Sequence, residues 1–191
     1  TVSIDPVGCK DIDDALSFKL LADNKAEVSI HIANVAQWID RHNITTNLYS
    51  TIYLKNGNQI NMLDDDITYN KLSLGNNGIP KKAMSLFLVY DIVSTNTNIY
   101  TLVESYFKEV MVKNTALSYS TSDDILAKDK AKLDNNSIYK TNSIEWMIVN
   151  LAALCGGYGY DDEVPSIPST KMVEHFMLLY NKIAAEKLYN F

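Results

Sequence analysis

Four aspartates close together near the start of the sequence constrain this chain more than any other feature. Asp5, Asp11, Asp13 and Asp14 fall within ten positions, and Lys10 is the only basic residue among them. Apolar residues precede the cluster and an alternating apolar segment follows it. Carboxylates this close repel one another unless a counter-charge is bound, and hard divalent cations such as Mg²⁺ prefer oxygen ligands. Paired metal ions of this kind promote in-line attack on phosphodiesters, so the cluster predicts metal-dependent nucleotide chemistry.

Two other interpretations of the acidic cluster compete with a metal site. A solvated surface turn is the usual role of a charge run, but this run is bounded by apolar residues on both sides. A calcium-binding EF-hand loop needs Gly at its sixth position and Glu at its twelfth. Counted from Asp11, those positions hold Leu16 and Ala22. The EF-hand is therefore excluded, and the surface turn stays an alternative.

The segment around the cluster resembles the opening of the RNB catalytic domain. This domain belongs to the processive 3′→5′ exoribonucleases of the ribonuclease II, ribonuclease R and exosome-nuclease family. The resemblance covers residues 3–17, including all four aspartates and the Ala15-Leu16-Ser17 that follows them. Other segments that resemble the family come in the same order along the chain: 28–35, 51–54, 60–63, 72–74, 83–85 and 172–181.

The resemblance implies an α+β fold, with an antiparallel β-rich first half followed by helices. It identifies residues 1–191 as a partial RNB catalytic domain, the N-terminal half, without the C-terminal portion and the flanking RNA-binding domains. The residue patterns agree with this order of elements. They predict strands over 15–22, 25–33, 49–54, 59–63, 83–93 and 98–112, with turns at Asp23-Asn24, Asn56-Gly57 and 94–96.

Helices are predicted mainly in the second half of the chain. A short helix is expected over 35–39, and Ser118 is the expected N-cap of a helix ending near residue 127. A polar connection is expected over 123–136, and a further helix over 142–154, ended by Gly156-Gly157. The strongest helical pattern runs over 170–189. Its apolar stripe comprises Val173, Phe176, Tyr180, Ile183 and Ala184.

The activity that the resemblance implies is hydrolysis of single-stranded RNA from its 3′ end, releasing nucleoside 5′-monophosphates by metal-assisted phosphodiester cleavage. Mg²⁺, with Mn²⁺ as a substitute, would be held by the four aspartates. Asp13 and Asp14 match positions assigned to catalysis as well. Tyr53 and Tyr119 match positions where aromatic side chains contact the last nucleotides. Glu174 matches a helix carboxylate that contacts the terminal ribose, and such a contact to the 2′-OH separates RNA from DNA.

The chain also departs from the family pattern. Asn34 stands where the family usually has Asp, and Glu174-His175 stands where two acidic residues are common. The family's Arg-bearing segment is missing. The missing Arg-bearing segment and flanking RNA-binding domains support an alternative, a non-catalytic RNA-binding relative or truncated pseudonuclease, whereas the four intact aspartates argue against it. A metal-binding structural domain with no role on nucleic acid is a third hypothesis.

Composition bounds the expected partners and compartment. The 191 residues contain two cysteines and neither a signal-peptide pattern nor an apolar run of membrane-spanning length. An intracellular, cytoplasmic protein without a membrane partner is therefore expected. The net charge of −6 argues mildly against nucleic-acid binding, although bound cations would offset the acidic cluster. The expected partners are single-stranded RNA and an exosome-like or other RNA-decay complex.

Overall fold

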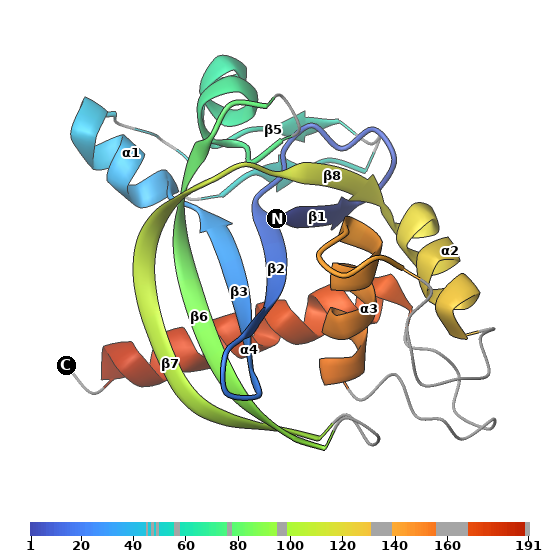
Figure 1. Cartoon of the computed structure of the whole chain (residues 1–191). Coiled ribbons are helices and arrows are strands. Elements are labelled where there is room, and N and C mark those ends of the chain that lie inside the picture. The colour runs from blue at the N-terminus through green and yellow to red at the C-terminus, as the bar shows by residue number, and fades with distance from the viewer. Residues whose placement is uncertain are drawn as a thin grey trace.

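The computed structural model describes residues 1–44, 46, 48, 50–55, 58–75, 78–94, 99–130, 139–155 and 168–189. Its centre is a six-stranded sheet in the order β7-β6-β3-β2-β1-β8 (Figure 1). The strands are β1 (Val2–Asp5), β2 (Asp14–Leu21), β3 (Lys25–Ala33), β6 (Lys81–Ser94), β7 (Ile99–Val112) and β8 (Thr115–Ser118).

The predicted antiparallel first half is confirmed, and one parallel pair that involves a strand of the second half makes the whole sheet mixed. Pairs β1–β2, β2–β3, β3–β6 and β6–β7 are antiparallel, whereas β1 and β8 are parallel. Strands β7 and β8 are consecutive in the chain, yet they lie at opposite edges of the sheet. Only Lys113 and Asn114 separate them. A link this short requires the sheet to curl until its two edges approach each other, as Figure 1 shows.

The β2–β3 hairpin forms where the sequence predicts it. Alternating residues pair in continuous register from Asp14 opposite Ile32 to Leu21 opposite Lys25. Asp23 and Asn24 adopt left-handed φ values of 58° and 53°, which short polar side chains tolerate better than most. The predicted turn is thereby confirmed.

The region between β3 and β6 differs more from prediction. Helix α1 (Val35–His42) is longer than expected, whereas strands β4 (Ile52–Tyr53) and β5 (Gln59–Ile60) are shorter. The expected turn residues Asn56 and Gly57 lie outside the described part of the chain. A π-helix, η1 (Asp66–Leu72), follows β5 and was not predicted. Its hydrophobic pattern is too short to show a helical period.

Two of the remaining helices begin at hydroxyl caps. Helix α2 (Tyr119–Lys130) follows Ser118, whose hydroxyl accepts a hydrogen bond from the backbone N–H of Thr121 at 3.1 Å, as predicted. Residues 123–130 are therefore helical, not the expected polar connection, and 131–136 lie outside the described residues. Helix α3 (Ile144–Leu154) is capped by Ser143, which accepts from the N–H of Trp146 at 3.1 Å. The residues expected to end it, Gly156-Gly157, also lie outside the described residues.

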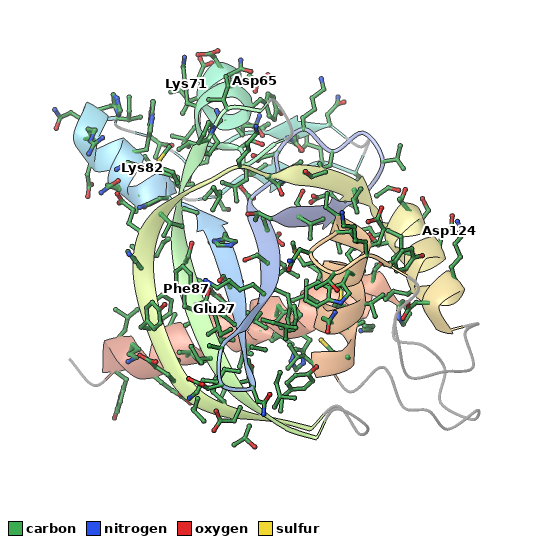
Figure 2. The ribbon with its side chains drawn as sticks, in the orientation of Figure 1. Glu27, Asp65, Lys71, Lys82, Phe87 and Asp124 are labelled. Atoms are coloured by element: carbon green, nitrogen blue, oxygen red, sulfur yellow. The ribbon has the colours of Figure 1, made fainter. Side chains whose placement is uncertain are left out.

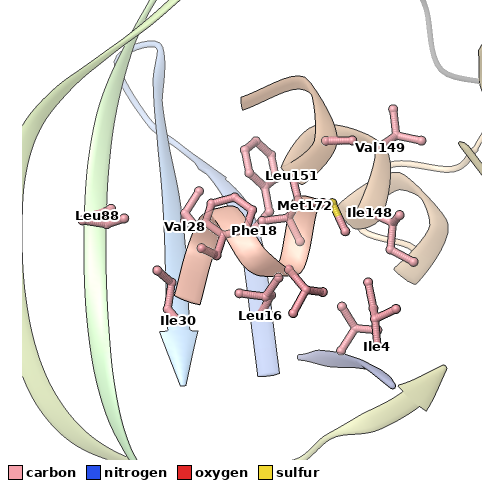
Figure 3. Close-up of a cluster of buried hydrophobic side chains, with 14 of the residues drawn as sticks. Ile4, Leu16, Phe18, Val28, Ile30, Leu88, Ile148, Val149, Leu151 and Met172 are labelled. Atoms are coloured by element: carbon pink, nitrogen blue, oxygen red, sulfur yellow. The ribbon is translucent and has the colours of Figure 1, made fainter. Parts of the chain in front are cut away.

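The main hydrophobic core lies between one face of the sheet and helices α3 and α4 (Ser169–Tyr189), as Figure 3 shows in close-up. From the predicted stripe of α4, Val173, Phe176 and Ile183 are buried. Tyr180 is half-buried, and its hydroxyl donates to the carbonyl of Met84 at 3.3 Å. Because α4 also packs against β1, the core supports the strand that ends at Asp5.

No helix within the described ranges is both long enough and apolar enough to cross a membrane.

Candidate metal and nucleic-acid site

The acidic loop joins β1 to β2, and it is held in place from a distant part of the chain. Ile12 is buried, its N–H donates to the Ser73 hydroxyl at 3.0 Å, and its carbonyl accepts from the N–H of Leu74 at 2.7 Å. The Ser73 hydroxyl in turn donates to the carbonyl of Lys10 at 3.1 Å. The loop's second half is further fixed by the Ala33 N–H, which donates to the carbonyl of Asp13 at 2.8 Å. Ser73 is thus a positioning residue that the sequence pattern did not reveal.

The structure brings Asp13 within electrostatic range of the other three aspartates. Asp13 is exposed and the other three are half-buried. The charge of Asp13 is a cause of the raised pKa of Asp5, Asp11 and Asp14, in each case after desolvation. The pKa values of Asp11 and Asp14 rise to about 6. Desolvation also raises the pKa of Asp13 itself. The carboxylates therefore form one electrostatically coupled cluster, with Asp13 at its centre.

One carboxylate oxygen of Asp5 is buried without a hydrogen bond from any described residue. This oxygen is Oδ2, and such an arrangement normally costs free energy. Burial is the main cause of its raised pKa, and a hydrogen bond from the Ser3 hydroxyl offsets part of the rise. Ser3 is oriented by Asn114, whose Nδ2 donates to the Ser3 Oγ at 2.9 Å. One carboxylate oxygen of Asp5 is thus left free for a ligand.

The donor set fits a hard divalent cation, although it is not gathered into a finished coordination shell. Across the described residues, no three Asp, Glu, His or Cys side chains are close enough together to hold a metal ion as they stand. Mutual repulsion favours separated carboxylates when no cation lies between them. The all-oxygen donor set and the unpartnered oxygen of Asp5 both match the ligand preference of Mg²⁺ or Mn²⁺.

A pocket of about 330 Å³ opens beside the cluster. Asp11 and Asp13 line one part of it, and Val35, Met62 and Leu72 are among the apolar residues that line the rest. A volume of this size lies at the lower end of the range of small-molecule sites, and a few polar groups among apolar walls are typical of such sites. We call it the carboxylate pocket.

The two predicted tyrosines differ in what the structure shows of them. Tyr119 is the first residue of α2, and after desolvation the charges of Asp5 and Asp14 are the main causes of its raised pKa. The structure therefore brings its phenol close to the carboxylates. Tyr53 lies on β4, two residues after Thr51, which lines the carboxylate pocket. The side chain of Tyr53 lies outside the described part of the structure.

Glu174 and Asn34 are not drawn into the cluster by any described contact. Glu174 is exposed on α4, and its Oε2 lies 2.5 Å from the Nζ of Lys171. Asn34 caps α1 by accepting from the N–H of Gln37 at 3.4 Å, and its Nδ2 donates to Glu109 at 3.0 Å. The Asp-to-Asn departure at position 34 thus serves a helix cap and a polar contact away from the four aspartates.

Comparison with known proteins identifies the family of this chain. Residues 1–154 match the family model described as RNB domain, and the chain belongs to the RNB-domain family. The exosome complex exonuclease RRP44 of Mus musculus is 30% identical over 98% of the chain, and exosome complex exonuclease dis3 of Schizosaccharomyces pombe is 26% identical over 98%. The chain spans 21% of the length of each of these relatives.

Two solved structures share the fold at low sequence identity. The Dss1 exoribonuclease from Candida glabrata, solved as an active-site mutant, superposes with a TM-score of 0.73 and 17% identity, covering 99% of this chain and 30% of that one. Yeast Ssd1, described as a pseudonuclease, has a TM-score of 0.50 and 18% identity, covering 66% of this chain and 15% of that one. The α+β fold of an RNB-domain segment is thereby confirmed.

Raised carboxyl pKa values predict how pH and metal act on stability. Asp11 and Asp14 titrate near pH 6 in the folded chain and near their ordinary value of 3.8 when unfolded. The stability they contribute is therefore present at low pH and lost as pH rises through about 6. His31 acts in the opposite direction, because its pKa is lowered to about 4 by burial, so its contribution is lost as pH falls below 6.5.

The double variant Asp11→Asn/Asp14→Asn isolates the carboxylate contribution, since His31 is unchanged in it. In EDTA, we measure the Tm of the variant minus the Tm of the wild type. We expect this difference to be about 2–4 °C larger at pH 7.5 than at pH 5, which is equivalent to roughly 1 kcal/mol. Mg²⁺ at millimolar concentration should raise the wild-type Tm more at pH 7.5 than at pH 5, because protons compete for the same oxygens. The prediction would be contradicted if the Tm of both proteins changed equally with pH. It would also be contradicted if Mg²⁺ raised the Tm of the variant as much as that of the wild type.

Proposed function

We propose that this chain forms the metal-binding part of a hydrolytic 3′→5′ exoribonuclease that releases nucleoside 5′-monophosphates from single-stranded RNA. The observation that carries the proposal is the coupled cluster of Asp5, Asp11, Asp13 and Asp14, with an unpartnered Asp5 oxygen, at the edge of the carboxylate pocket. Membership of the RNB-domain family supports it. So do the relatives named as exonucleases.

The four aspartates would hold Mg²⁺ or Mn²⁺. When bound, such an ion offsets charge on the scissile phosphate and lowers the pKa of the attacking water. Asp13 and Asp14 are the proposed catalytic residues. Asp13 is central to the cluster, and Asp14 is the first residue of β2, where the acidic loop joins the sheet. The ionised carboxylates also provide acceptor oxygens that can orient water near the phosphate.

Tyr119 is proposed to contact the last nucleotides, since its phenol is within electrostatic range of Asp5 and Asp14. Tyr53 and Glu174 keep the roles that the family resemblance gives them, stacking on a base and contacting the terminal ribose. Stacking on an aromatic side chain contributes about 1–3 kcal/mol per base and tolerates any sequence. An RNA-decay complex is the proposed partner assembly, because the relatives RRP44 and dis3 are named as exosome complex exonucleases.

The alternative is an RNB-like protein that binds RNA without turnover. One observation that favours it is the fold shared with the pseudonuclease Ssd1. The sequence also has a single arginine, Arg41, which does not line the carboxylate pocket. Phosphoryl-transfer sites commonly use such a cation for transition-state charge.

One assay separates the two functions. The full product of the reading frame that encodes this chain is incubated with 5′-labelled single-stranded oligo(A), in Mg²⁺ and in EDTA. An exoribonuclease shortens the RNA stepwise from its 3′ end and releases AMP only with metal, leaving DNA of the same sequence intact. RNA bound without any AMP release in Mg²⁺ or Mn²⁺ would establish the non-catalytic function instead.

A further inference from the structure

A second pocket, of about 170 Å³, lies between α1, the end of η1 and the start of β6. Four of its ten lining residues are basic, and among the described residues no Asp or Glu lines it. Figure 2 shows two of them, Lys71 and Lys82, at the end of the molecule that carries α1 and η1. We call it the basic pocket. Its four cationic residues are Arg41, Lys71, Lys81 and Lys82.

Positive charge in the basic pocket exceeds the negative charge around it. The Nζ of Lys82 lies 2.6 Å from Glu109, which also attracts Arg41 more weakly. Lys71 lies 3.9 Å from Asp66, an exposed pair of the kind that contributes little. Four of the 17 basic residues thus meet at one small pocket of a chain whose net charge is −6. A surplus of this kind favours an anionic ligand.

Lys81 shows that the surplus extends into the protein. It is only 7% exposed, and its ammonium donates to the backbone carbonyls of Asn70 and Lys71 at the end of η1. Burial lowers its pKa, and the charge of Lys71 lowers it further. Lys71 and Lys81 are therefore close enough to repel each other, and an anion bound between them would relieve that repulsion.

The basic pocket and the carboxylate pocket are neighbours. Leu72 lines both, and Lys71, directly before it, lines the basic pocket alone. The end of η1 therefore separates an acidic site from a basic one by the width of a single residue. The end of a polyanion could bind a cation that the carboxylates hold. The next part of its backbone would then lie near the basic pocket.

We propose that the basic pocket binds a backbone phosphate of the RNA strand whose 3′ end reaches the carboxylate pocket, with Arg41 and Lys71 as its direct contacts. This inference rests on the proposed function. A volume of about 170 Å³ suits a phosphate group better than a whole nucleotide. Arginine and lysine are the usual phosphate contacts, and such contacts position a strand without reading its sequence. Trp38, which is half-buried and lines the pocket, supplies an optical signal.

The test measures binding without cleavage. Anisotropy of a fluorescein-labelled single-stranded oligo(A) is followed in EDTA over a series of salt concentrations. The variant Arg41→Gln/Lys71→Gln is compared with Lys128→Gln/Lys187→Gln, which removes the same charge from exposed positions on α2 and α4. Each lost phosphate contact reduces the salt slope of a single-stranded complex by about 0.7. Because both residues contact the same phosphate, we expect the first variant to bind roughly 10-fold more weakly with a slope lower by about 0.7, and the control to change less than about 2-fold.

Two further measurements are independent of the anisotropy titration: tryptophan fluorescence with oligo(A), and the Tm in the presence of inorganic phosphate. Oligo(A) should change the emission of wild type, and Trp38→Phe should remove that change. Equal affinities in wild type and Arg41→Gln/Lys71→Gln, or equal losses in both double variants, would overturn the proposal. So would a phosphate-induced Tm shift that the variant loses while its RNA affinity stays intact, since that result identifies a site for the free anion.

Failure of this inference is distinguishable from failure of the proposed function. Wild-type protein that hydrolyses RNA while Arg41→Gln/Lys71→Gln binds it normally overturns the basic pocket alone. Wild-type protein that neither binds nor hydrolyses RNA overturns both.

Discussion

Asp13→Asn is expected to abolish metal-dependent RNA hydrolysis while leaving the fold and the affinity for RNA close to those of wild type. Asp13 is the carboxylate whose charge acts on Asp5, Asp11 and Asp14, and it lines the carboxylate pocket. Replacing it with a neutral amide removes a ligand oxygen with its charge, so a cation would be displaced from the position that the other three define. We expect the rate of AMP release to fall by roughly 10²–10³ or more.

The affinity for RNA should persist because the proposed strand contacts lie elsewhere, at Tyr119 and the basic pocket. Removing one negative charge from the cluster should also lessen repulsion of the phosphates, so the Kd in EDTA should stay equal or fall slightly. The measurement pairs a 5′-labelled RNA ladder in Mg²⁺ with anisotropy in EDTA.

Asp124→Asn is the matched control, because Asp124 is exposed on α2 and the exchange is the same. The control should retain the wild-type rate. Stepwise shortening of RNA by Asp13→Asn at the wild-type rate would remove Asp13 from the proposed site.

Phe176→Ala is expected to destabilise the fold by about 3–5 kcal/mol. Phe176 is 1% exposed and lies in the main core, where α4 packs on the sheet. Truncating a buried aromatic removes its apolar area from the core and leaves a cavity that neighbouring side chains fill only in part. For a chain of this length, the corresponding fall in Tm is on the order of 10 °C. Urea unfolding followed by far-UV circular dichroism measures the change in the free energy of unfolding.

Leu178→Ala provides the control on the same helix. Leu178 is 63% exposed, so its truncation should change stability by no more than about 0.5 kcal/mol. Because α4 packs against β1, Phe176→Ala should also weaken the Tm increase produced by Mg²⁺, since β1 ends at Asp5. Equal stability changes in the two variants would contradict the placement of α4 against the sheet.

The sequence by itself determined the elements whose signals are local. Alternation of apolar residues defined β2 and β3, and Asp23-Asn24 defined the turn between them, because a period of two and a left-handed turn depend only on near neighbours. The hydroxyl cap at Ser118 and the buried stripe of α4 were predictable for the same reason. The acidic cluster was visible because its four members are close in sequence.

Only the tertiary structure decided how distant segments complete the site. The parallel pairing of β8 with β1 brings Tyr119 beside Asp5 and Asp14, more than 100 positions away in the sequence. Ser73 holds the acidic loop across 61 positions, and the basic pocket gathers side chains from α1, η1 and β6. Contacts of this kind leave no periodic pattern in either segment, because they depend on how the sheet curls and which edges meet. The sequence therefore identified the carboxylates, whereas the curled sheet determined which distant residues lie around them.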